Sequence, residues 1–125
     1  SGRPLAYALP RIVDQKTPWG DIKQSVRFMG VDGFTRKWTP RYAYGGLLTE
    51  NIVQAMARDL MAAGMVRVED AGYPVVLSVH DEIVSDVRSD HGSLQEFMDL
   101  MKVVPRWAEG CPVAVEGREG PRYRK

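Results

Sequence analysis

Three polar residues, His80, Asp81 and Glu82, lie between two runs rich in β-branched residues in the stretch VVLSVHDEIVSDV at positions 75–87. Val and Ile fit the pleated surface of a strand, so two such runs around a short polar centre predict a β-hairpin with the triplet at its tip. Two adjacent carboxylates on a stiff hairpin can bind a divalent cation through hard oxygen ligands. The residues alone also fit a plain turn, since Asp is common in turns for its local hydrogen bonds.

Helical patterns flank this hairpin. Before it, apolar residues such as Ile52 and Met56 recur at helical spacing within residues 47–72, where Thr49 or an earlier residue can cap the start. Gly72, with Pro74 two residues later, ends that helix. A second helix is expected after the hairpin.

The second helix has a start signal and a stop signal. Ser93 with Glu96 forms a capping-box signature, an apolar stripe follows, and Pro105 stops the helix. We expect one more short strand at residues 113–115, followed by a basic, Gly-rich tail.

In the first 45 residues, Gly and Pro separate short stretches that mix apolar and polar residues. This pattern predicts strands and turns rather than helices. Two turns are expected, at residues 18–20 and 31–33. The whole chain is therefore expected to be a single α+β domain with a small antiparallel sheet, two main helices packed on one face and an extra N-terminal β-hairpin unit. Residues 1–45 form a β-rich, insertion-like segment, and residues 46–125 form a helix-hairpin-helix-strand core.

Composition and charge narrow the setting. The chain has 125 residues, 44% of them hydrophobic, and one cysteine, Cys111, which excludes an internal disulfide. We find no bilayer-length apolar run and no signal-peptide pattern, so a cytoplasmic location is expected. Residues 1–45 contain eight basic and three acidic residues, whereas residues 46–115 contain five basic and eleven acidic ones. Basic flanks around an acidic centre suit a protein whose flanks meet phosphates while its centre holds cations.

Four stretches carry a resemblance to a known family: the opening SGRPLAYALPRI, then YGGLLTENIVQAMARDLM, GYPVVLSVHDEIVSDV and the final EGREGPRYRK. In this order they resemble the C-terminal part of the palm subdomain of family A (DNA polymerase I-like) DNA polymerases, particularly the phage-type members. The resemblance covers nearly the whole chain and is most specific across residues 44–88. It implies a DNA-replication enzyme, of a phage or prophage, that uses two Mg²⁺ ions for nucleotidyl transfer.

The resemblance also implies roles at the hairpin. Asp81 matches the second metal-bridging aspartate, and Glu82 matches a neighbouring carboxylate that supports the metal site, so both are catalytic and metal-binding candidates. His80 falls where the family has a histidine against the primer end. In the family the chain terminus lies near the active site, which makes Arg122 a candidate for phosphate contact.

DNA-binding candidates on the first helix are Gln54 and Asn51, on a face that meets the DNA minor groove in the family. The family places an Asn four residues before the Gln, but Glu50 holds that position here and Asn51 lies three before. The family's upstream Arg aligns near Gly46, so its contact is missing or is supplied by Arg41 or another basic residue.

Two parts of such an active site are missing. No Asp-Tyr-Ser-like stretch supplies the first catalytic aspartate, and the nucleotide-binding helix has only a false match in RKWTPRYAYGG. There the spacing from Lys37 to Tyr44 is seven, and Pro40 would break a helix at a cost of about 3 kcal/mol. We therefore expect these 125 residues to be inactive alone, with the two-metal site completed by residues outside the chain.

Other functions stay open at this point. A non-catalytic prophage relic or accessory module could keep the fold and bind DNA or a partner chain. A small metal-dependent nuclease built on His80, Asp81 and Glu82 is disfavoured because no further ligand cluster completes its site. The polymerase reading implies primer–template DNA, dNTP and the remainder of the polymerase chain as partners. Exposed sheet edges could also pair in a homo-oligomer.

Overall fold

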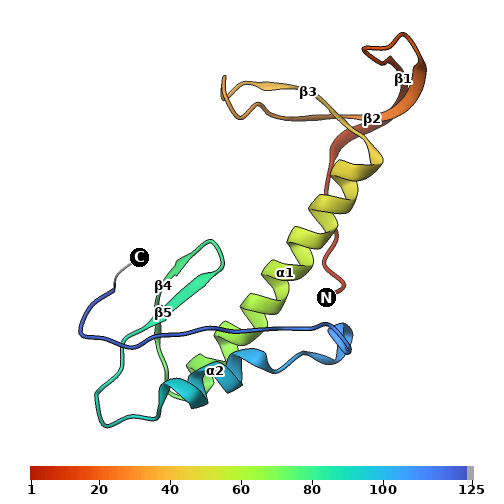
Figure 1. Cartoon of the computed structure of the whole chain (residues 1–125). Coiled ribbons are helices and arrows are strands. Elements are labelled where there is room, and N and C mark those ends of the chain that lie inside the picture. Colours follow the sequence, from red (N-terminus) through yellow and green to blue (C-terminus); the bar gives the residue numbers. More distant parts are fainter. Residues whose placement is uncertain (124–125) are drawn as a thin grey trace. The chain divides into compact units, whose positions relative to one another are not determined.

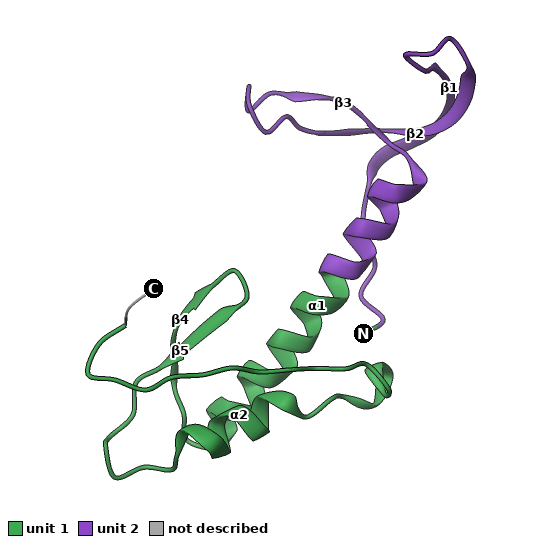
Figure 2. Ribbon diagram, in the orientation of Figure 1, with its two compact units in different colours: residues 1, 55–125 green, residues 2–54 purple. Residues whose placement is uncertain are grey.

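The computed structural model describes residues 1–123, which divide into two compact units (Figures 1 and 2). The first unit along the chain covers residues 2–54, and the second covers residues 55–123 together with Ser1. The elements in chain order are β1 (Ala8–Lys16), β2 (Ile22–Val31), β3 (Trp38–Ala43), α1 (Gly45–Asp70), β4 (Val75–Val79), β5 (Glu82–Ser85), α2 (Leu94–Lys102) and the 3₁₀ turn η1 (Arg106–Ala108). The expectation that the chain is a single domain stays a prediction.

Residues 2–54 contain a three-stranded antiparallel sheet in the order β1-β2-β3. The first expected turn is present at residues 18–20, whereas the second lies at residues 33–35, two residues beyond the predicted 31–33, because Val31 still pairs in β2. The β1–β2 turn closes with the Gly20 amide donating to the Thr17 carbonyl, and Gly20 has a φ of 93°, a conformation that glycine adopts without strain. The absence of helices before residue 45, predicted from the Gly and Pro pattern, is confirmed.

The false match for a nucleotide-binding helix is a strand. Residues 38–43 form β3, with Pro40 opposite Met29 of β2. Proline cannot donate a ladder hydrogen bond and is tolerated at the edge of a sheet, which is where β3 lies. The predicted absence of a helix at these residues is confirmed.

Helix α1 begins at Gly45, two residues before the predicted range, and Thr49 lies inside it. The Thr49 hydroxyl donates back to the Gly45 carbonyl instead of capping the helix. At the other end, the amides of Gly72 and Tyr73 donate to the carbonyls of Glu69 and Val68, the pattern of a Schellman motif around a glycine with φ 88°. The predicted stop at Gly72 is confirmed.

The core of residues 55–123 lies where the C-terminal half of α1 meets α2. A Cβ added to Gly64 would meet the Met101 side chain at 2.8 Å, so the small residue leaves room for the end of that side chain where α2 meets α1. Val68, Tyr73 and Ala108 are the buried apolar residues of this described unit. The core is small, and it joins the C-terminal half of α1 to α2.

The predicted capping box is half formed. Ser93 Oγ accepts from the Glu96 amide at 3.1 Å, as expected, but Glu96 does not bond back to Ser93. Instead the buried Tyr73 hydroxyl donates to the Glu96 carboxylate at 2.6 Å and accepts from the Ser93 amide at 3.0 Å. The carboxylate acceptor and the burial of the ring raise the pKa of Tyr73.

The strands form two separate sheets, β1-β2-β3 and β4-β5. The first stands where the extra N-terminal hairpin unit was expected and has three strands, and the second contains the expected hairpin. One expectation about the strands was wrong: residues 113–115 form no strand, because β-branched residues alone do not create a ladder. The coarser expectation, an α+β chain with two main helices and small antiparallel sheets, is confirmed. In the described part of the chain, no helix combines the length and the apolar character needed to cross a membrane.

Candidate active site

The β4–β5 hairpin closes through a two-residue loop. Val79 pairs with Glu82, so His80 and Asp81 form the loop and Glu82 is the first residue of β5. His80 has a φ of 53°, in the left-handed region that two-residue hairpin loops require at their first position. The histidine is thus part of the turn geometry as well as a candidate contact residue.

All three residues of the triplet are exposed. No hydrogen bond or ion pair among residues 1–123 reaches the Asp81 carboxylate, which leaves both of its oxygens available to a ligand. Asp81 therefore lies at an accessible tip, outside any apolar core.

Glu82 has a partner that the sequence did not reveal. The Tyr123 hydroxyl donates to Glu82 Oε2 at 2.8 Å, so the C-terminal tail returns to the hairpin (Figure 1). The hydrogen bond to this carboxylate is the main cause that raises the pKa of Tyr123. Arg122, the residue before Tyr123, is exposed. Tyr123 could have been found only from the aromatic residue in an otherwise basic, Gly-rich tail, which is a weak signal.

The triplet does not form a complete metal site within the described chain. No group of three or more His, Cys, Asp or Glu side chains among residues 1–123 is arranged to hold a metal ion. Asp81 offers a free carboxylate, and Glu82 offers one that already accepts from Tyr123. These donors fit part of a Mg²⁺ ligand set, which usually combines one or two carboxylates with water molecules and substrate phosphates.

The helix candidates lie in the N-terminal part of α1, within residues 2–54. Asn51 Nδ2 donates to the Tyr7 hydroxyl at 3.0 Å, and the Tyr7 ring packs edge-on against Phe28 of β2 at 5.0 Å. Gln54 is exposed, and its amide nitrogen donates to Glu50 Oε1 at 3.1 Å, one turn earlier. Asn51 is thus anchored towards the sheet, whereas the Gln54 amide is held on the surface.

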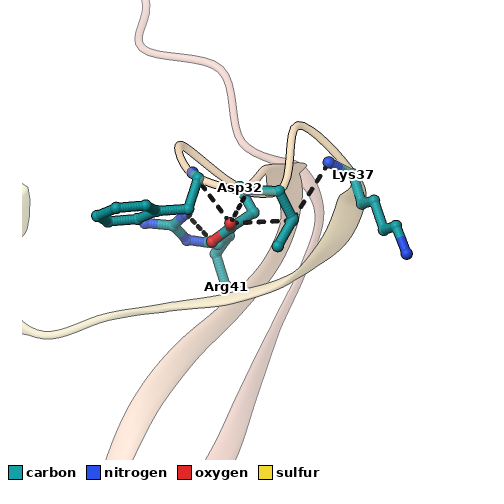
Figure 3. A network of polar contacts seen from close by, with 5 residues as sticks. Asp32, Lys37 and Arg41 are labelled. Carbon is teal, nitrogen blue, oxygen red and sulfur yellow. Dashed lines mark hydrogen bonds and ion pairs between the residues drawn. The ribbon is translucent and has the colours of Figure 1, made fainter.

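Arg41 is engaged in the β2–β3 hairpin. Its guanidinium lies 3.2 Å from Asp32 Oδ2, and Figure 3 shows the side chain directed at that carboxylate. Asp32 also accepts from the amides of Phe34 and Thr35 at 3.1 and 2.8 Å. These hydrogen bonds, with Thr35 contributing most, lower the pKa of Asp32. A DNA contact by Arg41 stays a prediction, and it would compete with this ion pair.

The structure thus brings Asp81 and Glu82 together on one hairpin and adds Tyr123 to them. It joins Asn51 to Tyr7 and leaves Gln54 exposed. Sequence reasoning missed Tyr7, whose role depends on a contact with a residue 44 positions away.

The chain is similar to a known viral protein. The chain is 39% identical to a DNA polymerase of Bacillus phage SP02 over 126 aligned residues, which cover 100% of this chain and 19% of the polymerase. The chain therefore spans about a fifth of the length of the curated relative that it matches. No protein-family model and no solved structure matches the chain.

Proposed function

We propose that this chain is the C-terminal part of the palm of a phage-type family A DNA polymerase, acting in template-directed nucleotidyl transfer. The similarity to a phage DNA polymerase along the whole chain carries the proposal. The Asp81 carboxylate at a tight hairpin loop supports it, because a metal-binding aspartate must be accessible to the ion and held on a rigid element.

In this proposal Asp81 is a ligand of Mg²⁺, and Glu82 supports the same site from the start of β5. Bound Mg²⁺ ions would supply activation of the primer 3′-hydroxyl and neutralisation of the triphosphate charge. Asp81 contributes an unpaired carboxylate fixed by the hairpin. The hydrogen bond from the Tyr123 hydroxyl restricts the Glu82 side chain before any metal binds. The side chain then loses less conformational entropy on binding.

Primer–template DNA is the proposed partner of several further residues. His80 would lie against the primer end, and Gln54 would read the acceptors that all base pairs share in the minor groove. Asn51, Arg41 and Arg122 are additional contacts. Arg122 is exposed beside the tail residue that reaches the hairpin, which favours a phosphate contact near the proposed metal site.

The remainder of the polymerase chain is the proposed protein partner, and it would bring the first catalytic aspartate and the dNTP-binding helix. The hairpin supports this need for a partner, because Val76 and Leu77 of β4 are 59% and 41% exposed. We therefore propose that the 125 residues alone do not polymerise, that they work in a bacterial host cytoplasm, and that exposed sheet edges permit self-association of the isolated piece.

A graft tests the proposal in a complete enzyme. The aligned segment of the phage SP02 DNA polymerase is replaced with this chain, and extension of a primed template is measured with Mg²⁺. The unsubstituted graft should extend primers. Asp81→Asn should reduce extension by at least about 100-fold, since even the outer-shell partners of metal ligands are commonly worth 10- to 100-fold.

Asp86→Asn is the matched control, because Asp86 is an exposed carboxylate just beyond β5. It should leave extension within about threefold, as expected for a surface change away from the metal. A folded graft that does not extend primers, or an Asp81→Asn graft as active as Asp86→Asn, would contradict the proposal and favour a non-catalytic DNA-binding module.

A further inference from the structure

One face of the β1-β2-β3 sheet carries cations and aromatic rings without any carboxylate. Side chains alternate along a strand, and residues directly opposite on neighbouring strands share a face. The pairing of Arg11 with Arg27 and of Arg27 with Tyr42 places these three residues in one row. The same face holds Gln15, Lys23 and Trp38, and we call these six residues the Arg11 face.

The central row brings two like charges together. Arg11 and Arg27 are direct cross-strand partners, which places their Cβ atoms roughly 5 Å apart. Like charges in this arrangement repel. Among residues 1–123 neither arginine belongs to an ion pair, so the chain supplies no anion to offset the repulsion.

The acidic residues of the first 45 positions all lie elsewhere. Asp14 is opposite Gln24, on the other face of the sheet, and Asp21 lies in the β1–β2 turn. Asp32 is engaged within the β2–β3 loop. The Arg11 face is therefore positively charged and complementary to an external anion.

Aromatic rings complete the face. Tyr42 is 45% exposed in the same row as the two arginines, and Trp38 is 58% exposed four residues earlier on β3. Exposed rings on a positively charged sheet face are the arrangement on which unstacked bases stack while cations contact the phosphates. An apolar protein partner would use the rings but would bury the arginines without a counter-charge.

We propose that the Arg11 face binds single-stranded nucleic acid, with Arg11 and Arg27 on phosphates and Tyr42 and Trp38 on bases. The inference goes beyond the proposed polymerase activity, since it requires no metal and no residue of the β4–β5 hairpin. Its test measures binding instead of catalysis, so the two proposals fail independently.

The 125-residue chain itself is titrated against fluorescein-labelled dT20, and binding is measured by fluorescence anisotropy at 50 and 200 mM salt. Arg11→Gln is compared with Lys16→Gln, since both positions are exposed on β1 but on opposite faces. Arg11→Gln should weaken binding about three- to tenfold and reduce the salt slope by about 0.7, the value for one contact to a single strand. Lys16→Gln should change affinity by less than about twofold.

Tyr42→Leu and Tyr42→Phe form the second pair. The leucine variant should weaken dT20 binding by roughly tenfold, and the phenylalanine variant, which keeps the ring, should bind like the unsubstituted chain. Circular dichroism identifies variants that have lost the fold. Equal effects of Arg11→Gln and Lys16→Gln, unaltered binding by Tyr42→Leu, or equal competition by poly-glutamate would each overturn the proposal.

Discussion

The β2–β3 and β4–β5 hairpins each place an aspartate in the loop, and the two carboxylates have opposite surroundings. Asp32 accepts from the amides of Phe34 and Thr35 and pairs with Arg41. Asp81 has no hydrogen bond or ion pair among residues 1–123. The first carboxylate organises its own loop, and the second takes no part in the hydrogen bonds of the described chain.

Loop length explains this difference. Residues 32–37 separate β2 from β3, and that longer loop needs side-chain acceptors for its backbone amides. The β4–β5 loop has two residues and is closed by the strand ladder itself, with His80 in the left-handed conformation. In this chain the two-residue loop closes without the Asp81 carboxylate, whereas the longer loop uses the Asp32 carboxylate as an acceptor for its amides.

The difference between Asp32 and Asp81 is tested most sharply by the backbone amides of the two loops. Asp32→Ala should accelerate amide hydrogen exchange at Phe34 and Thr35 by roughly tenfold or more, since hydrogen bonds to a charged acceptor are among the stronger ones. Asp81→Ala should change exchange at Val79 and Glu82 by less than about twofold. Exchange measured by NMR checks both, and a similar effect of the two variants would remove the distinction.

Lowering the pH provides a second test of the difference between Asp32 and Asp81. The pKa of Asp32 is lowered below 3.8, so its contribution to stability is present above that pH and is lost as pH falls through the folded-state pKa. The amide shifts of Phe34 and Thr35 should titrate with a midpoint below 3.8. A midpoint at or above the ordinary value would show that the hydrogen bonds do not stabilise the ionised carboxylate.

Raising the pH should reveal the hydrogen bond between Tyr123 and Glu82 of the second hairpin. The pKa of Tyr123 is raised above 10.0 by the carboxylate, so the contact is present below that pH and is lost as pH rises through the folded-state pKa. The difference in ultraviolet absorbance between the chain and Tyr123→Phe should titrate above pH 10.0, and Glu82→Gln should lower that midpoint. An unchanged midpoint in Glu82→Gln would contradict the contact.

The smallest expected effect concerns the sheet that carries the first hairpin. Arg11→Gln should raise the free energy of unfolding by a few tenths of a kcal/mol, because it relieves repulsion with Arg27. Lys16→Gln, on the other face, should not stabilise. Urea unfolding followed by circular dichroism provides the measurement. A loss of stability in Arg11→Gln would mean that the arginine contributes more by packing than it costs by charge.

Local signals in the sequence predicted the elements well. Gly72 ends α1, Ser93 caps α2, and Pro40 excludes a helix, because each acts through the backbone within a few residues. The same reasoning placed Asp81 in a hairpin between two strands, although the loop contains only two of the three polar residues.

Long-range pairing accounts for what the sequence did not reveal. Residues 113–115 have strand-forming side chains but no neighbouring strand, and Glu96 leaves its capping box because Tyr73, 23 positions away, donates to it. The partners of Asn51 and Glu82 are 44 and 41 positions away in sequence. No short-range pattern encodes such contacts.

Prolines in the outer strands of the three-stranded sheet affect how copies of the chain could meet. β1 contains Pro10 within its bulge, and β3 contains Pro40 near its middle. Each proline removes a backbone donor from its strand, and a bulge bends the strand away from a flat template. β4 also carries an irregularity, between Val75 and Leu77, so a second molecule that extends a ladder would find its most regular row of donors and acceptors along β5, and crowded solutions of this chain should join through that strand first.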